Sequence, residues 1–213
     1  MDREDKIRGK CFGTEEGSLI WWNSTNWMSI VLSIMVWLTI LYSASVTLIV
    51  ILEGEYSLTN GIIILVLCAM SLWCHIATMC ADPGAVPMDA HPLPRDIRAG
   101  VPISMCGSCD SFKPYGAHHD RISNRCISRM DHFCPWMNNA IGAKNQKSFI
   151  LFLIYTDAAA LYMLALLVVH LVDCEALHCQ HFSSTTLTLV RVLVFLLLFA
   201  VLFTTAMVFN QAY

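Results

Sequence analysis

Charged residues are scarce in this sequence. Lysine, arginine, aspartate and glutamate account for 14% of its 213 residues, whereas 56% are hydrophobic. A soluble globular domain carries about a quarter charged residues, so this composition argues against a soluble protein. Charge is missing chiefly from four apolar segments, 27–52, 58–80, 149–172 and 186–209. Each is near or above the roughly 20 residues that span the hydrocarbon core of a bilayer, and we predict four transmembrane helices.

Lysine and arginine are absent from two of the three connections between these segments. The connections near Glu53 and Asp173 contain acids alone, whereas every lysine and arginine except Arg191 lies in residues 1–26 or 81–148. The positive-inside rule therefore places both termini and the central connection in the cytosol. The first apolar segment starts too late and is too long for the core of a cleaved signal peptide.

Four of the ten cysteines lie in the central connection, where a reducing cytosol favours metal binding or catalysis over disulfides. Cys106 and Cys109 are spaced as half of a tetrahedral zinc site, and His119 with Cys126 can complete a Cys3His set. Zinc would supply folding energy to a stretch with little apolar core. A thioredoxin-like redox pair is the alternative, although no βαβ pattern surrounds it. His118 is an alternative ligand to its neighbour.

The expected fold is an all-α membrane protein with four transmembrane helices. A small zinc-stabilised cytosolic cysteine-rich domain lies between the second and third helices. We divide the chain into a cytosolic N-terminal arm, a first transmembrane hairpin, the cytosolic domain, and a second hairpin with a very short C-terminal end. These parts comprise residues 1–26, 27–80, 81–148 and 149–213.

Two ionisable residues interrupt the later apolar segments. We expect Asp157 to make a structural hydrogen bond in the bundle interior, and Arg191 to reach the nearby membrane interface. Cys174 and Cys179 lie in the connection across the membrane, where a disulfide is permitted. The sequence leaves open whether these two cysteines are bridged.

The run Asp131-His132-Phe133-Cys134 places a base beside a thiol. A thiol is a weak nucleophile until it is ionised, and a nearby imidazole can take its proton. Asp131 can hold the imidazole in the required tautomer, as the carboxylate of a catalytic triad does. Trp136 follows and would line the site. A further metal-binding cluster is the alternative interpretation.

The region 106–149 resembles the cysteine-rich domain of the DHHC-type protein S-acyltransferases, or palmitoyltransferases. Asp82-Pro83-Gly84 resembles the short motif after the second helix of that family. The four-helix layout with a central cytosolic connection is also theirs, so the resemblance covers nearly the whole chain. The other matches in register are Lys113-Pro114, Ala117-His118-His119, Met130-Asp131-His132, Cys134-Pro135-Trp136, Asn138-Asn139, Ile141-Gly142 and Asn145-Gln146.

The resemblance implies a two-step acyl transfer. Cys134 would take a fatty acyl group from an acyl-CoA such as palmitoyl-CoA and pass it to a cysteine of a membrane-associated protein. His132 would be the base, and Asp131 the orienting carboxylate. The zinc ligands implied are the four residues named above. The family also implies a Golgi or endoplasmic reticulum membrane, and we expect no nucleic-acid partner.

Basic residues of the central connection are candidates to hold the CoA phosphates. They are Arg125, Arg129, Lys144 and Lys147. Retention of the domain on the cytosolic side of the bilayer is an equally good explanation of their charge. Trp136 would line the acyl-CoA site beside the nucleophile.

The chain departs from the family pattern at its second zinc site. The usual Cys, Cys, His and Cys are replaced by Asp120, Ser123, Phe133 and Ala140. Because all four ligands are replaced, no thiolate is stranded. We expect one structural zinc, with this half of the domain held by packing around Phe133 and Ala140 and by hydrogen bonds at Asp120 and Ser123.

Two further departures leave other functions open. Gly116 stands where the family usually has arginine, and Thr204-Thr205-Ala206-Met207 resembles a motif that ordinarily ends in glutamate. An inactive relative that acts as a scaffold or trafficking protein is the alternative to an enzyme. A small channel or transporter is a third class, for which only Asp157 and Arg191 suggest a polar path.

Overall fold

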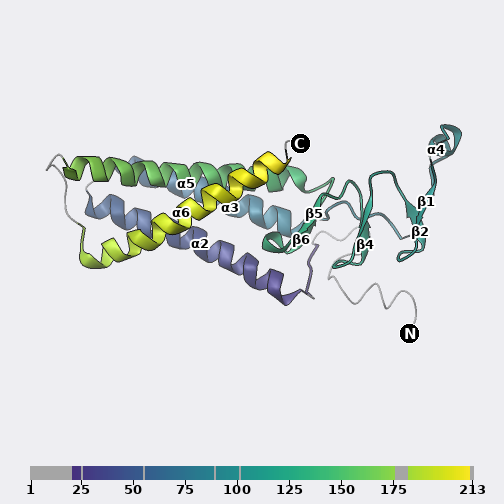
Figure 1. Cartoon of the computed structure of the whole chain (residues 1–213), viewed down its shortest axis with the longest axis horizontal. Helices are drawn as coiled ribbons and strands as arrows, with labels where there is room; N and C mark the ends of the chain where they lie inside the picture. The colour runs from purple at the N-terminus through teal and green to yellow at the C-terminus, as the bar shows by residue number, and fades with distance from the viewer. Residues whose placement is uncertain are drawn as a thin grey trace. The chain divides into compact units, whose positions relative to one another are not determined.

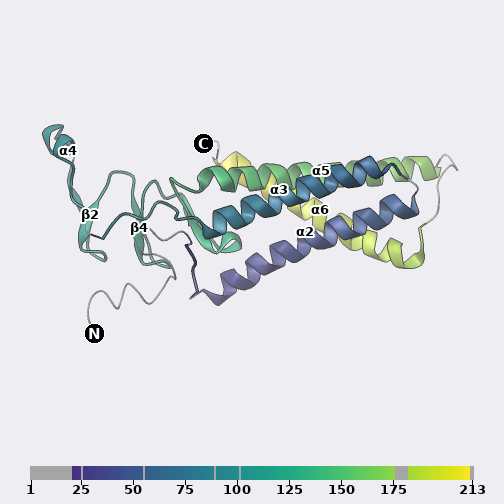
Figure 2. The same cartoon turned by 180° about the vertical axis from the view of Figure 1, so that it is seen from behind.

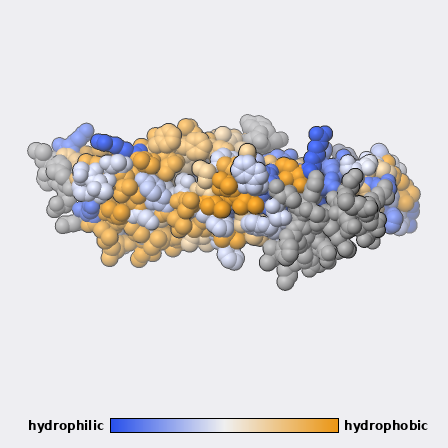
Figure 3. All heavy atoms as spheres, turned by 90° about the horizontal axis from the view of Figure 1, so that it is seen from below, coloured by the Kyte–Doolittle hydropathy of each residue, from blue (hydrophilic) through white to orange (hydrophobic). Residues whose placement is uncertain are grey.

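The computed structural model describes residues 21–24, 26–54, 56–88, 90–100, 102–175 and 182–211. Its long helices are α2 (Trp27–Glu53), α3 (Leu58–Cys80), α5 (Gln146–Glu175) and α6 (Ser184–Gln211). Within these ranges, four helices are long and apolar enough to cross a membrane, as predicted. Helix α5 extends beyond the predicted 149–172 at both ends, because hydropathy reports lipid contact whereas hydrogen bonds set a helix's ends. Apolar side chains cover much of the helical surface in Figure 3, as lipid contact requires.

The chain divides into two compact units. The first comprises Met1–Ile34 and His75–Phe149, and the second comprises Met35–Cys74 and Ile150–Tyr213. Helices α2 and α3 therefore contribute to both units. The second unit is a helix bundle in which α6 crosses the other helices obliquely, as Figures 1 and 2 show from opposite sides.

Polar side chains link the helices of the second unit. Thr204 Oγ1 donates to Asp157 Oδ1 over 2.9 Å, which joins α6 to α5 and provides the hydrogen bond predicted for this carboxylate. Tyr162 donates its hydroxyl to Asn60 Oδ1 over 2.8 Å, which joins α5 to α3. Such bonds satisfy polar groups that would be costly to leave unpaired in lipid.

A second polar group lies where the helices of the second unit are connected. The Tyr56 hydroxyl is 2.9 Å from His170 Nδ1, and the imidazole stacks on Phe182 with ring centroids 3.9 Å apart. Glu53 accepts a hydrogen bond from Thr186 Oγ1 over 2.8 Å. Cys174 is disulfide-bonded. Cys179 lies outside the described residues.

The cysteine-rich domain is built from short antiparallel hairpins rather than helices. The pairs are β1 (Ser104–Cys106) with β2 (Ser111–Lys113), β3 (His118–Asp120) with β4 (Arg125–Ile127), and β5 (His132–Cys134) with β6 (Asn139–Ile141). A short helix, α4 (Pro94–Arg98), precedes them, and a 3-10 turn, η1 (Pro135–Met137), connects the last pair. Strands of three residues are too short to give a periodic pattern, so the sequence did not predict them.

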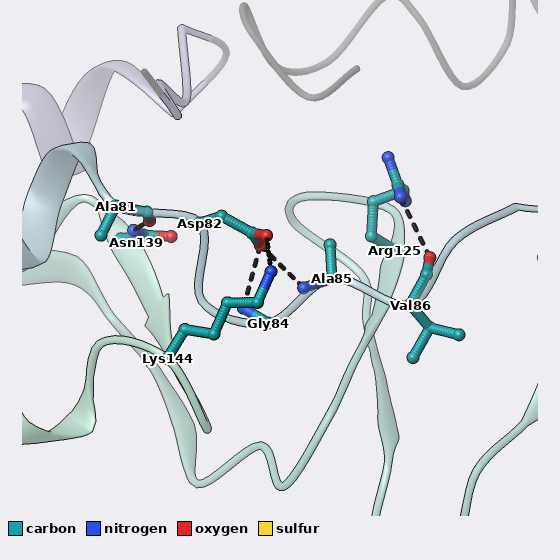
Figure 4. Close-up of polar contacts among 8 residues, drawn as sticks. All are labelled: Ala81, Asp82, Gly84, Ala85, Val86, Arg125, Asn139 and Lys144. Carbon is teal, nitrogen blue, oxygen red and sulfur yellow. Dashed lines mark hydrogen bonds and ion pairs between the residues drawn. The ribbon is translucent and has the colours of Figure 1, made fainter. Parts of the chain in front are cut away.

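The segment after α3 forms a tight connection to the cysteine-rich domain. Asp82 Oδ1 accepts the backbone N–H groups of Gly84 and Ala85 over 2.9 and 2.8 Å, and Asp82 Oδ2 binds Lys144 Nζ at 2.7 Å (Figure 4). Val86 then donates its N–H to the carbonyl of Cys126 over 2.8 Å. The end of α3 is thereby fixed to strand β4, which carries a candidate zinc ligand.

Candidate active site and metal centre

The four predicted zinc ligands converge in the first unit. Their donor atoms all lie within 4.8 Å of one another. His119 Nδ1 is 3.6 Å from Cys106 Sγ, 3.3 Å from Cys109 Sγ and 4.0 Å from Cys126 Sγ. The sulfurs of Cys109 and Cys126 are 3.7 Å apart. The hairpin β3–β4 produces part of this geometry because His119 and Cys126 are directly opposed in its register.

These separations fit a tetrahedral zinc ion. Zinc–sulfur bonds of about 2.3 Å and zinc–nitrogen bonds of about 2.05 Å place two sulfurs about 3.8 Å apart and a sulfur and a nitrogen about 3.6 Å apart. The three cysteines are buried, as in structural sites closed to water. The cluster therefore suits zinc. The ring nitrogen in this cluster belongs to His119 rather than to His118, the alternative that the sequence left open.

The positions at which the resemblance implies a second zinc site carry other side chains. Asp120 is buried, and its carboxylate accepts the N–H groups of Ile122 and Ser123 over 3.2 and 2.8 Å. Phe133 and Ala140 face each other across the β5–β6 hairpin. In the described part of the chain, the Cys3His cluster is the one group of at least three potential metal ligands. Turn hydrogen bonds at Asp120 and a facing pair of Phe133 and Ala140 therefore occupy the positions where the resemblance implies the second set of ligands.

Strand β5 carries the predicted base and nucleophile. His132 Nδ1 lies 3.0 Å from Asp131 Oδ2, so the ring nitrogen donates and the carboxylate accepts. The other ring nitrogen, Nε2, is buried and has no hydrogen-bond partner among the described residues. The ring also meets Phe149 edge-on, with centroids 5.6 Å apart. The imidazole is thus oriented on one side and available on the other.

Cys134 ends β5 and precedes η1, and its side chain is 3% exposed. It lies two residues from His132 on the same strand, so both side chains emerge on one face. Burial raises the pKa of the Cys134 thiol to about 11. The charge of Asp131 adds to this increase in pKa, whereas the backbone N–H groups of Met137 and Trp136 oppose it. At neutral pH the thiol is protonated and needs a base.

Buried asparagines hold this hairpin against the end of α3. The Asn139 amide donates to the carbonyls of Thr78, Met79 and Ala81 over 3.0, 3.2 and 2.8 Å, which pairs carbonyls that the helix leaves unsatisfied. Figure 4 shows the contact with Ala81. Asn145 donates to the carbonyls of Ala140 and Thr78. The sequence flagged these asparagines as family matches but gave no role for them.

The candidate phosphate-binding residues differ in their surroundings. Arg129 is exposed, whereas the Lys144 ammonium is paired with Asp82. Arg125 is buried and donates to the carbonyl of Val86 over 3.0 Å (Figure 4), which gives it a structural role. Trp136 lies in η1 beside the nucleophile and is half-buried.

A comparison with protein families identifies this constellation. The family model of the DHHC palmitoyltransferases matches residues 101–213, more than half of the chain. This chain belongs to the DHHC palmitoyltransferase family. The predicted assignment to the DHHC-type protein S-acyltransferases is thereby confirmed.

Individual relatives agree with the family match. Palmitoyltransferase ZDHHC3 of Rattus norvegicus is 34% identical over 204 residues, which cover 90% of this chain and 68% of the relative. Palmitoyltransferase ZDHHC7 of Mus musculus is 33% identical over 215 residues, which cover 96% and 69%. A plant relative, probable protein S-acyltransferase 16 of Arabidopsis thaliana, is 34% identical over 125 residues, which cover 55% and 44%. The match thus extends beyond the cysteine-rich domain into the helices.

Proposed function

We propose that this protein moves a long-chain fatty acyl group from acyl-CoA to cysteines of membrane-associated proteins through a thioester on Cys134. One observation carries the assignment of residues. The Asp131–His132 hydrogen bond leaves Nε2 of the imidazole free, two residues from a buried cysteine on the same strand. These features support an activated nucleophile, in which a third group orients the base.

The first step forms the acyl-enzyme. His132 Nε2 takes the proton of the Cys134 thiol while the sulfur attacks the thioester carbonyl carbon of acyl-CoA. The bond between that carbon and the CoA sulfur breaks, and the leaving thiolate accepts the proton from the imidazolium. Asp131 keeps the proton on Nδ1 and stabilises the positive charge of the ring.

The second step reverses the roles of the two thiols. The thiol of the protein substrate loses its proton to His132 and attacks the acyl carbon on Cys134. The Cys134–acyl bond breaks, and the Cys134 sulfur recovers the proton. Free enzyme is regenerated, and the fatty acid is now attached to the substrate through a thioester.

The helix bundle of the second unit encloses a small cavity. An apolar cavity there is lined by side chains of α2, α3, α5 and α6, among them Ile40, Cys68, Ala159, Ala160 and Leu197. Burial of each methylene group contributes about 0.8 kcal/mol, so apolar contact alone can bind the fatty chain of an acyl donor.

The positions of the basic residues support a CoA-binding site in the central connection and a cytosolic orientation of both termini. Arg129 and Lys144 would meet the CoA phosphates, and the ring of Trp136 would line the acyl-CoA site. The concentration of lysine and arginine in the arm and the central connection supports a cytosolic position for both termini. Acyl-CoA and the substrate cysteines would then meet the enzyme at the cytosolic face. By analogy with the family, we propose a Golgi or endoplasmic reticulum membrane.

Labelling of purified protein with radioactive palmitoyl-CoA tests this function. The wild type should acquire hydroxylamine-sensitive label, and Cys134→Ala should not. Cys80→Ala is the matched control, because Cys80 is also outside the metal cluster and partly buried. Label that persists in Cys134→Ala would overturn the assignment of the nucleophile. A zinc-loaded wild type that takes up no label would point instead to the scaffold function.

A further inference from the structure

The backbone carbonyl of Trp136 is held by side chains of two different helices. Ser33 of α2 donates its hydroxyl to this oxygen over 2.9 Å, and His75 Nε2 of α3 lies 3.0 Å from it. Both side chains are buried, at 3% and 0% exposure. All three residues belong to the first unit. Two polar side chains within apolar helices thus converge on one peptide group beside the nucleophile.

The hydrogen bonds have a defined direction. A carbonyl oxygen has no proton to give, so His75 must donate from Nε2 and is in its Nε2–H tautomer when neutral. A hydroxyl and an imidazole N–H aimed at one oxygen fill both of its lone pairs. Placing two donors on one carbonyl leaves that peptide plane little freedom to rotate.

The N–H side of the same peptide group, which belongs to Met137, faces the Cys134 sulfur. The peptide bonds of the chain are trans, so the Trp136 carbonyl and the Met137 N–H point in opposite directions. The Met137 N–H, and that of Trp136, lie against the Cys134 sulfur. Fixing the carbonyl therefore aims the Met137 N–H at the sulfur, and hydrogen bonds to the carbonyl polarise that N–H further.

We infer that Ser33 and His75 are positioning residues that act through the Trp136–Met137 peptide to stabilise the thiolate of Cys134. They connect α2 and α3 to the nucleophile without touching it. The inference rests on the proposed function for its catalytic meaning, because a stabilised thiolate at this position matters only if Cys134 reacts. Its geometric content can be tested separately, through the reactivity of the thiol itself.

The chain provides a matched control for the serine. Ser29 lies one helical turn earlier on α2, is 0% exposed, and its hydroxyl has no partner among the described residues. Ser33→Ala and Ser29→Ala therefore remove the same atom from the same helix, but only the first should affect Cys134. For the histidine, His75→Leu removes the donor, whereas His75→Gln places an amide N–H near the position of Nε2.

The test is the rate at which iodoacetamide alkylates Cys134 at pH 8 in the full-length protein, followed by mass spectrometry of the Cys134 peptide. Ser33→Ala and His75→Leu should slow alkylation roughly three- to tenfold, the change that one net hydrogen bond produces. Ser29→Ala should match the wild type, and His75→Gln should recover most of the rate. Titration of the alkylation rate across pH should show its midpoint moved upward in both variants. Asp131 and His132 of β5, which lie near Cys134, keep their wild-type side chains in these proteins.

The direction of the change separates positioning from loss of fold. A loosened domain would expose the buried thiol and speed its alkylation, so an unchanged or faster rate in Ser33→Ala and His75→Leu overturns the inference. Zinc content near that of the wild type verifies that each variant is folded. If the alkylation pattern is as expected but wild type takes up no palmitoyl label, the positioning role stands and the proposed function fails. If the wild type takes up palmitoyl label but alkylation is unaltered in the variants, the proposed function stands and the positioning role fails.

Discussion

His132 donates its Nδ1 proton to the Asp131 carboxylate over 3.0 Å, and this contact fixes which ring nitrogen is free. We predict that His132→Ala slows acyl-enzyme formation by about 10²- to 10⁴-fold, the usual contribution of a general base. Asp131→Asn should slow it less, because Asp131 acts through the ring. Single-turnover labelling of each variant with palmitoyl-CoA measures both. A larger loss in Asp131→Asn than in His132→Ala would contradict the assigned roles.

Alkylation of Cys134 should depend on pH in a way that reports its burial. The pKa of about 11 means that the thiolate fraction, and with it the alkylation rate, rises about tenfold per pH unit to near pH 11. In the denatured protein the rate should level off near pH 9, because 9 is the ordinary pKa of a cysteine thiol. A native profile that levels at or below pH 9 would show that the thiol is not held in its neutral form.

Removal of the Asp82 carboxylate should destabilise the domain more than removal of its charged partner. Asp82→Ala leaves the N–H groups of Gly84 and Ala85 without their acceptor and should cost about 1–3 kcal/mol. Lys144→Ala should cost less than about 1 kcal/mol, because the ammonium side chain is 64% exposed. Denaturant unfolding of the two variants, monitored by the release of zinc, compares their free energies of unfolding. Equal losses would mean that the ion pair, not the turn, secures the segment.

The protein should bind one zinc ion per chain. Cys109→Ala should lose the metal, because it removes a ligand of the Cys3His cluster. Phe133→Ala should retain the metal, because Phe133 contributes no ligand atom to the cluster. Metal analysis of purified protein checks the stoichiometry. Two ions per chain, or loss of zinc in Phe133→Ala alone, would contradict the expectation of a single zinc site at the Cys3His cluster.

The sequence predicted the features that depend on composition and on local spacing. The membrane helices follow from long apolar runs, and the zinc ligands from a Cys-x-x-Cys with two partners a few residues away. The Asp120 turn was also predictable, because its carboxylate binds N–H groups two and three residues ahead. These interactions are local, or they rest on chemistry that few residue types can perform.

The contacts that connect the helices to the site were not predictable. Ser33 and Trp136 are 103 positions apart, and His75 and Trp136 are 61 apart. A serine or a histidine in an apolar segment does not reveal its partner, because only the fold brings the two together. Lys144 illustrates the same limit, because the sequence does not reveal that the fold pairs its ammonium with Asp82.

The site of the acyl group tests the central claim most directly. After brief incubation with palmitoyl-CoA, the protein can be digested without reducing agent and its cysteine peptides compared by mass spectrometry. The account predicts one palmitoyl adduct, on the peptide that contains Cys134, lost after hydroxylamine treatment. An adduct confined to another cysteine, with Cys134 unmodified, would contradict it.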